Sequence, residues 1–172
     1  AKILNVNKDS RVMDIAAGSA AFLVAAMDQM IEDANKVYGK GTKRAAEEIE
    51  TIKHEKLLGV EIDAKMYTLA ASNMILRGDG STKIRKADTF STPKEIYTEF
   101  MANVLLLNPP FSYVDNGLPF LEFGLDNMEV GGKAAVIIQD SVGAGKSIGT
   151  TANILKRHKM LASIKMPADL FM

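Results

Sequence analysis

The chain has 172 residues and a mass of 18.6 kDa, enough for one domain with a sizeable core. Its 21 basic and 21 acidic residues cancel, which argues against a protein that holds nucleic acid by its own charge but not against a catalytic subunit whose partner does so. The absence of cysteine excludes disulfides and thiolate metal sites, two histidines make a metal site unexpected, and the lack of a long apolar run or a signal peptide predicts a cytoplasmic protein that does not enter membranes.

The first part of the chain twice shows a strand followed by a helix. Residues 11–16 form a short apolar run, and beyond the turn at Gly18 apolar residues recur at helical spacing over 21–35. A second apolar run at 57–62 is followed by a helix predicted over 63–78, with a capping aspartate at its start and a glycine at its end.

Between these two units lies a charged segment, residues 38–56, that is punctuated by glycine. Charged segments of this kind usually form a solvated face. We expect an insertion that is partly helical from Ala45, and we assign it no chemistry.

The second part of the chain continues the alternation. The predicted elements are strands at 82–87, 103–110 and 133–140, helices at 118–132 and 149–158, and a last apolar run at 160–167. Such alternation predicts a mainly parallel sheet that helices cover on both faces. Ligands bind such sheets at the carboxyl ends of the strands.

Acidic residues stand at three of these strand ends. Asp14 precedes the Gly18 turn, where a glycine lets a ligand approach the backbone. Glu61 is placed to accept the hydroxyls of a ribose, and Asp88 could accept an exocyclic amine. Each also has a structural interpretation, namely a tight turn, a helix start capped by Asp63, and a turn aspartate. Their recurrence at one topological place favours a nucleotide-like cofactor.

The fourth strand ends at Asn108-Pro109-Pro110-Phe111, the most specific feature of the sequence. The prolines end the strand and leave the Pro109 carbonyl free as an acceptor beside the Asn108 amide oxygen. Two adjacent acceptors suit an amino group with two hydrogens, and Phe111 could stack on the ring that carries it. The structural alternative is a rigid loop with an aromatic plug.

Two other features receive structural interpretations. The segment SVGAGKS at 141–147 resembles a phosphate loop, but Asp140 stands where that motif requires glycine, so we expect a mobile glycine-rich loop. The ten methionines lie mostly at helical spacing and on strands, which favours core packing.

In this order, the motifs resemble those of DNA methyltransferases that act on adenine N6, in particular the modification subunit of type I restriction-modification systems. The resemblance covers nearly the whole chain and is carried by DIAAGSAAFL, GVEIDAKMYTLAASNMILRGDG, KADTF, NPPF, GGKAAVIIQDSV and SIKMPADLF. The chain departs from the family in the first motif, where Ile15, Ala17 and Ala20 replace a proline, a cysteine and a glycine.

The resemblance implies a Rossmann-like, S-adenosylmethionine-dependent methyltransferase fold whose last antiparallel strand is missing. It implies a cofactor site made by Asp14, Ala16, Gly18, Ser19, Glu61, Ile62, Asp88 and Thr89. It also implies that Asn108, Pro109, Pro110 and Phe111 hold a flipped target adenine for direct methyl transfer, without a metal.

By the same resemblance, residues 1–172 are a catalytic-core fragment without the upstream helical domain or a target-recognition domain. The expected partners are DNA and the specificity and restriction subunits of a type I complex. Two alternatives stay open. One is a methyltransferase acting on a glutamine side chain in protein, and the other is a non-catalytic nucleotide-binding or assembly module.

Overall fold

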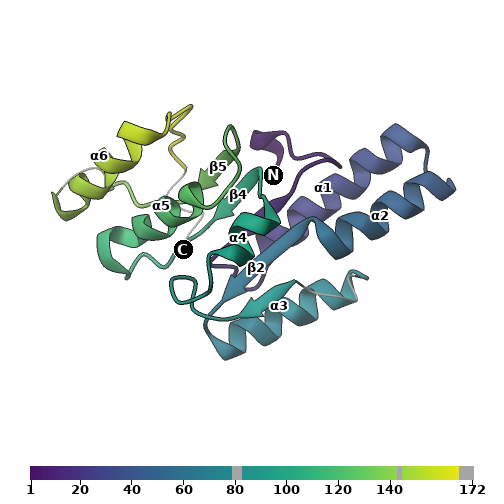
Figure 1. The fold of residues 1–172 in the computed structure, drawn as a ribbon, viewed down its shortest axis with the longest axis horizontal. Helices are drawn as coiled ribbons and strands as arrows, with labels where there is room; N and C mark the ends of the chain where they lie inside the picture. The colour runs from purple at the N-terminus through teal and green to yellow at the C-terminus, as the bar shows by residue number, and fades with distance from the viewer. Residues whose placement is uncertain (79–82, 143–144, 167–172) are drawn as a thin grey trace.

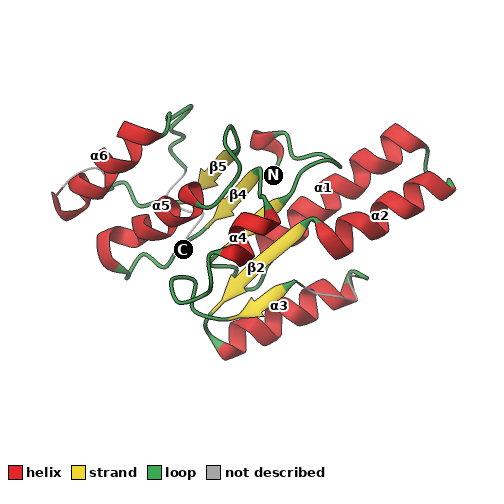
Figure 2. Cartoon of the chain, in the orientation of Figure 1, coloured by secondary structure: helices red, strands yellow, loops and turns green. Residues whose placement is uncertain are grey.

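The computed structural model describes residues 1–78, 83–142 and 145–166. Its centre is a five-stranded sheet in the order β3-β2-β1-β4-β5, and every pairing between neighbours is parallel (Figure 2). The strands are β1 Val12–Asp14, β2 Leu57–Glu61, β3 Ile84–Lys86, β4 Val104–Leu107 and β5 Lys133–Val136. The predicted Rossmann-like α/β architecture is therefore confirmed, with strands shorter than the apolar runs that predicted them.

Six α-helices are described in these ranges, and they lie on both faces of the sheet (Figure 1). They are α1 Ala21–Tyr38, α2 Lys43–Glu55, α3 Ala64–Leu76, α4 Glu95–Phe100, α5 Leu118–Asp126 and α6 Ile148–Arg157. Short 3-10 turns at Lys2–Leu4, Val114–Gly117 and Gly145–Ser147 complete the described elements.

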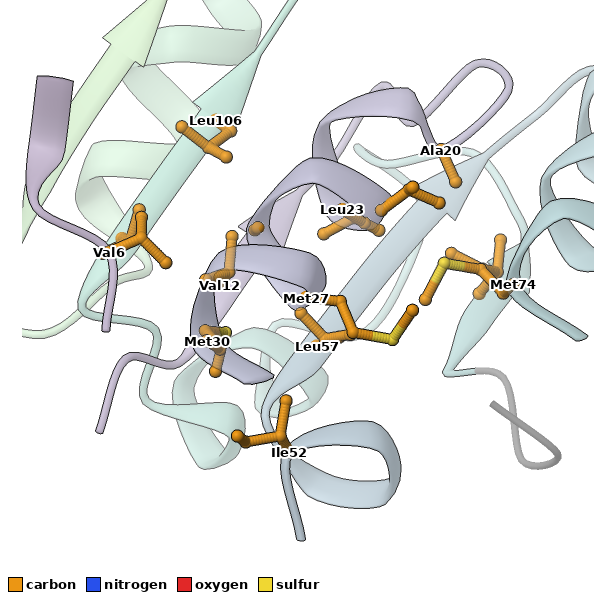
Figure 3. Close-up of a cluster of buried hydrophobic side chains, with 14 of the residues drawn as sticks. Val6, Val12, Ala20, Leu23, Met27, Met30, Ile52, Leu57, Met74 and Leu106 are labelled. Atoms are coloured by element: carbon orange, nitrogen blue, oxygen red, sulfur yellow. The ribbon is translucent and has the colours of Figure 1, made fainter. Parts of the chain in front are cut away.

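One face of the sheet is covered by α1, α2 and α3. Leu23 and Met27 of α1 and Met74 of α3 pack in one buried cluster with Val12 and Leu57 of the sheet (Figure 3). Fully burying a side chain of this size stabilises a fold by roughly 1.5–3 kcal/mol. The methionines of this cluster thus serve as core, as their spacing predicted.

The opposite face is covered by α4 and α5. Because side chains alternate along a strand, Met13 and Leu105 point to this side and pack with Tyr97 and Phe100 of α4 and Phe123 of α5. Helix α6 packs on α5, and this contact includes ion pairs from Arg157 to Glu122, at 2.6 Å, and to Asp126.

Strand order reverses between β1 and β4, which are neighbours although β2 and β3 come between them in sequence. In open α/β sheets such a switch point leaves a crevice outside the carboxyl ends of the two strands. In this chain the carboxyl end of β1 is Asp14, and Asn108 directly follows the carboxyl end of β4.

Several predicted boundaries were wrong. The helix predicted over 118–132 ends at Asp126, because Glu129 N pairs with Ala102 O at 2.8 Å and leads the chain into β5. Helix α1 continues to Tyr38, and the sequence did not predict the short helix α4. Residues 160–166 form no strand, while Pro167 and the predicted strand start at Thr82 lie outside the described residues.

The charged segment is mainly helix α2, which starts at Lys43 instead of Ala45. Thr42 caps the helix, because its Oγ1 accepts a hydrogen bond from Ala45 N at 3.1 Å. Ile52 is buried in the core beside α1. In the described part of the chain no helix is both long and apolar enough to cross a membrane.

Candidate active site

Asp14 is the last residue of β1 and is buried, with only 2% of its surface exposed. Its Oδ1 accepts a hydrogen bond from Ala16 N at 3.1 Å. Burial raises the pKa of Asp14 to about 7, and the charge of Glu61 adds to the rise, while the bond from Ala16 opposes it. The carboxyl group therefore changes its protonation state near neutral pH.

The loop that follows β1, residues 15–20, is held from several sides; we call it the Gly18 loop. Ala17 N donates to Val60 O at 3.0 Å, and Asn73 of α3 donates to Ser19 O at 2.9 Å. Gly18 has a φ of +53°, and a Cβ there would make only an ordinary contact with Met66 Cε at 3.8 Å, so the glycine is required by its backbone conformation and not by lack of space.

The next turn residue, Ala20, is also left-handed, with a φ of +62°, and is fully buried. This is the position where the resembled family has a glycine. An alanine in this conformation costs about 1–2 kcal/mol that a glycine would not.

Glu61 links the Gly18 loop to β2. Its Oε2 accepts a hydrogen bond from Gly18 N at 2.7 Å, and its Oε1 accepts one from Asp63 N at 2.8 Å. Asp63 in turn caps α3 by accepting bonds from Lys65 N and Met66 N, both at 2.9 Å, so the cap interpretation of Asp63 is correct. Ile62 between them is 66% exposed.

Asp88 and Thr89 follow β3. Asp88 accepts bonds from Phe90 N at 2.9 Å and Ser91 Oγ at 3.1 Å, which is the geometry of a turn aspartate. Thr89 is buried and donates through Oγ1 to Ile15 O at 2.5 Å. The loop after β3 is thereby fastened to the Gly18 loop.

The segment after β4, residues 108–117, is called the Asn108 loop. Asn108 and Pro110 are exposed, Pro109 is buried and Phe111 is half-buried. Within the part of the chain that the structure describes, the Asn108 side chain makes no hydrogen bond. Its amide oxygen therefore keeps its capacity to accept a hydrogen bond, and its role in binding an amino group stays a prediction.

The Asn108 loop ends in an unusual turn. Asp115, Asn116 and Gly117 are all left-handed, with φ of 50°, 56° and 80°. At Gly117 a Cβ would lie 2.8 Å from Pro109 Cβ, so only glycine fits against the proline. For the other two residues this conformation costs roughly 1–2 kcal/mol each, which contacts outside the turn have to offset.

Aromatic rings connect the loops after β3 and β4. Phe90 stacks on Tyr113 with ring centroids 5.7 Å apart and planes inclined by 16°. Phe120 packs against both rings, at 4.7 and 5.2 Å, and Phe123 contacts Phe90 edge-on at 5.5 Å. Both Phe90 and Tyr113 retain exposed surface, 37% and 42%, which a planar ligand could cover.

An open cavity of about 650 Å³ lies between the Asn108 loop and the start of α6. It is lined by Phe111, Ser112, Tyr113, Val114, Asp115, Asn116, Ser141, Gly145 and Ser147. Of the segment SVGAGKS, residues 143 and 144 lie outside the described residues, and Gly145–Ser147 form a 3-10 turn leading into α6.

All twelve predicted site residues lie at the carboxyl end of the sheet, Asp14 and Glu61 as the last residues of β1 and β2 and the other ten on the loops that follow the strands. Gly18 is joined directly to Glu61, and Thr89 is joined to the Gly18 loop, whereas no bond between described residues joins Asn108 to the three acids. Among the described residues no cluster of three or more histidines, aspartates and glutamates could hold a metal ion.

Sequence reasoning missed several residues that shape this edge, including Asn73, Phe90 and Tyr113. It also missed the hydrogen bonds from α6 to the Asn108 loop: Asn116 Nδ2 donates to Ser147 Oγ at 3.0 Å, and Thr150 Oγ1 to Asp115 Oδ2 at 2.6 Å. The run Asp-Asn-Gly was a usable signal, since these residue types tolerate left-handed turns.

Comparison with known proteins gives consistent results. The model of the N-6 DNA methylase family matches residues 1–118. The type II restriction enzyme and methyltransferase RM.BcgI of Heyndrickxia coagulans is 33% identical over 181 residues, which cover 99% of this chain and 27% of that protein.

Several solved structures share the fold. The M protein of the type I restriction enzyme EcoKI aligns with a TM-score of 0.70 at 22% identity, over 88% of this chain and 35% of its own. A chain of a type I R-M system aligns with a TM-score of 0.72 at 19% identity, over 90% of this chain and 33% of its own. The chain thus spans about a quarter to a third of the length of these proteins.

Proposed function

Because the chain belongs to the N-6 DNA methylase family, we propose that it transfers a methyl group from S-adenosylmethionine to the N6 amino group of adenine in DNA. One observation carries the proposal. Asn108, whose side chain makes no hydrogen bond among the described residues, stands at the end of β4. In the sheet this end is next to the end of β1, which carries Asp14 and the Gly18 loop, and later residues of the Asn108 loop line an open cavity.

The residues at the ends of β1, β2 and β3 fit the proposed cofactor. The backbone of the Gly18 loop, which no side chain at residue 18 covers, would hold the methionine end near Asp14, Ala16 and Ser19. Each Glu61 oxygen accepts one backbone hydrogen bond and keeps a lone pair for a ribose hydroxyl. The Asp88 carboxylate would accept the adenine amine, with Ile62 and Thr89 beside the ring. Bound there, the cofactor supplies an electrophilic methyl group on a sulfonium ion.

The residues after β4 fit the acceptor. The Asn108 amide oxygen and the Pro109 carbonyl would accept the two N–H groups of the target amine. This holds the nitrogen lone pair out of conjugation with the ring and directs it at the methyl group. Pro110 fixes the backbone, and Phe111 would stack on the flipped base. As the new N–C bond forms, the bond from the methyl carbon to the sulfonium sulfur would break and leave a neutral thioether, and one amine hydrogen would then leave as a proton. Positioning would supply most of the rate.

We further propose that residues 1–172 act as the catalytic core of a larger assembly. The neutral net charge of the chain is low for a protein that grips DNA alone, so a specificity subunit would select the sequence and a restriction subunit would share the complex. The names of the matched proteins support this, since both solved relatives are parts of type I restriction enzymes or systems.

The deciding experiment incubates the intact protein with its assembly partners, DNA and S-adenosylmethionine carrying a labelled methyl group. We expect N6-methyladenine among the nucleosides after digestion, and a loss of about 10²- to 10³-fold in rate for Asn108→Ala, because a preset acceptor is removed. Asn108→Ala should leave cofactor affinity unchanged.

Label found in polypeptide glutamine instead of DNA would favour the protein methyltransferase alternative. If the intact assembly transfers no label, the non-catalytic module becomes the better explanation.

A further inference from the structure

The Asn108 loop ends in a turn that its own backbone does not favour. Asp115 and Asn116 are left-handed residues with side chains, directly before Gly117. A conformation of this kind persists only where surrounding structure determines it. The question is which part of the molecule holds the turn.

Two hydrogen bonds from the start of α6 provide the answer, and we call them the α6 tethers. Asn116 Nδ2 donates to Ser147 Oγ at 3.0 Å, and Thr150 Oγ1 donates to Asp115 Oδ2 at 2.6 Å. Ser147 is only 2% exposed, so water competes little for its hydroxyl. Asp115 and Asn116, the two left-handed residues of this turn that have side chains, are therefore each held by one tether.

The tethered turn also touches the residues proposed to bind the target amine. A Cβ at Gly117 would meet Pro109 Cβ at 2.8 Å and Pro110 O at 3.1 Å. With so little space between the turn and the prolines, a displacement of the turn displaces Pro109 and its carbonyl. The cavity beside Phe111 is lined by both partners of one tether, Asn116 and Ser147.

We infer that Ser147 and Thr150 are positioning residues for methyl transfer, which hold Asn108 and the Pro109 carbonyl in place through the turn at Asp115 and Asn116. This inference rests on the proposed function and adds to it a role for α6. The effect falls on the target base, because both tethers reach the Asn108 loop and neither hydrogen bond involves a residue proposed to bind the cofactor.

The test measures single-turnover methyl transfer by the intact protein with its partners. Thr150→Val removes one tether at constant shape, and Ser147→Ala removes the other. We expect each to lower the rate roughly 10- to 100-fold, since small misplacements of reacting groups have effects of this size. Thr150→Ser keeps the hydroxyl and should restore a rate close to wild type.

A matched control is Thr98→Val in α4, where the exposed hydroxyl bonds only to carbonyls of its own helix. Its rate should equal that of the wild type. Cofactor affinity, measured by calorimetry, should be unchanged in all these variants. A fluorescent 2-aminopurine in place of the target adenine should report less base extrusion in Thr150→Val and Ser147→Ala.

Asn116→Gly separates positioning from simple stabilisation of the turn. Glycine adopts the left-handed conformation without steric cost. If the tether only stabilised the backbone of the turn, Asn116→Gly would therefore keep the wild-type rate. Positioning predicts instead that Asn116→Gly loses as much rate as Ser147→Ala.

Wild-type rates in Thr150→Val and Asn116→Gly would overturn the inference and leave the proposed function intact. Thr150→Val and Asn116→Gly also test the inference on their own if Ser147→Ala does not fold. A wild-type assembly that methylates no adenine in DNA would instead refute the proposed function, and the inference with it.

Discussion

The two sides of the switch point are organised in opposite ways. On the side of β1, β2 and β3, the carboxylates of Asp14, Glu61 and Asp88 all accept hydrogen bonds from backbone amides of the loops around them. On the side of β4, the Asn108 side chain is exposed and, within the described residues, makes no hydrogen bond. The Asn108 loop is instead fixed by two side-chain hydrogen bonds to residues at the start of α6.

The difference shows two ways of preparing a site. The acids stabilise their own loops first and have lone pairs left over for a ligand, so their loss should weaken both the fold and the binding of a cofactor. Asn108 contributes nothing to the fold that is visible in hydrogen bonds. Its loss should therefore affect chemistry alone.

The largest effect that would sharpen this comparison concerns the buried Asp14. Its pKa is about 7 in the folded protein, against roughly 4 in an unfolded chain, so the folded state binds the proton more tightly. The resulting stabilisation is fully present below about pH 4 and is lost as the pH rises through about 7, and its size is on the order of 4 kcal/mol.

Asp14→Asn should remove this dependence, because the amide does not titrate. Urea unfolding of both proteins at pH 5 and pH 8 measures it, with the difference between them as the readout. If the free energy of unfolding changed with pH equally in the two proteins, Asp14 would not be a buried, protonated acid. The contrast between a buried acid that stabilises the fold and an exposed Asn108 would then weaken.

An intermediate effect is expected for Glu61. Glu61→Ala removes the acceptor of the Gly18 and Asp63 amides and of the proposed ribose hydroxyls, so affinity for S-adenosylmethionine should fall about 10- to 100-fold by calorimetry. The matched control is Glu129→Ala, an exposed glutamate before β5 at the opposite end of the sheet. Equal affinities in the two variants would break the comparison.

The smallest effect concerns the contact between the two sides, the stacked rings of Phe90 and Tyr113. A double-mutant cycle with Phe90→Leu and Tyr113→Leu should give a coupling free energy of about 0.5–1.5 kcal/mol in unfolding. The same double-mutant cycle can be measured on the affinity for the target base, with and without cofactor. It then shows whether cofactor bound after β1, β2 and β3 changes the affinity for the base after β4. A coupling of zero would mean that the sides act independently.

Much of this edge was predictable because its signals are local. An apolar run that stops at an acid marks the end of a buried strand, which located Asp14 and Glu61, and Asn108-Pro109 marked the end of β4 in the same way. The parallel order then brought these ends together without any knowledge of side-chain packing.

What escaped prediction depends on distant contacts. Asn116 and Asp115 find their partners 31 and 35 residues further along the chain, and no local pattern pairs them. The end of α5 is set by the pairing of Glu129 with Ala102 in another segment. Alanine ordinarily favours a right-handed helix, so the residue type at position 20 did not indicate its left-handed backbone, although the glycine of the resembled family at this position did.

The position of β1 at the centre of the sheet also has a consequence for synthesis. β1 can pair with β2 as soon as Glu61 has emerged, but its other partner begins only at Val104. A ribosome adding about 5–20 residues per second needs roughly 2 to 8 seconds for the roughly 40 residues between them. During that interval the edge of β1 that becomes the switch point is open to pairing with another nascent chain.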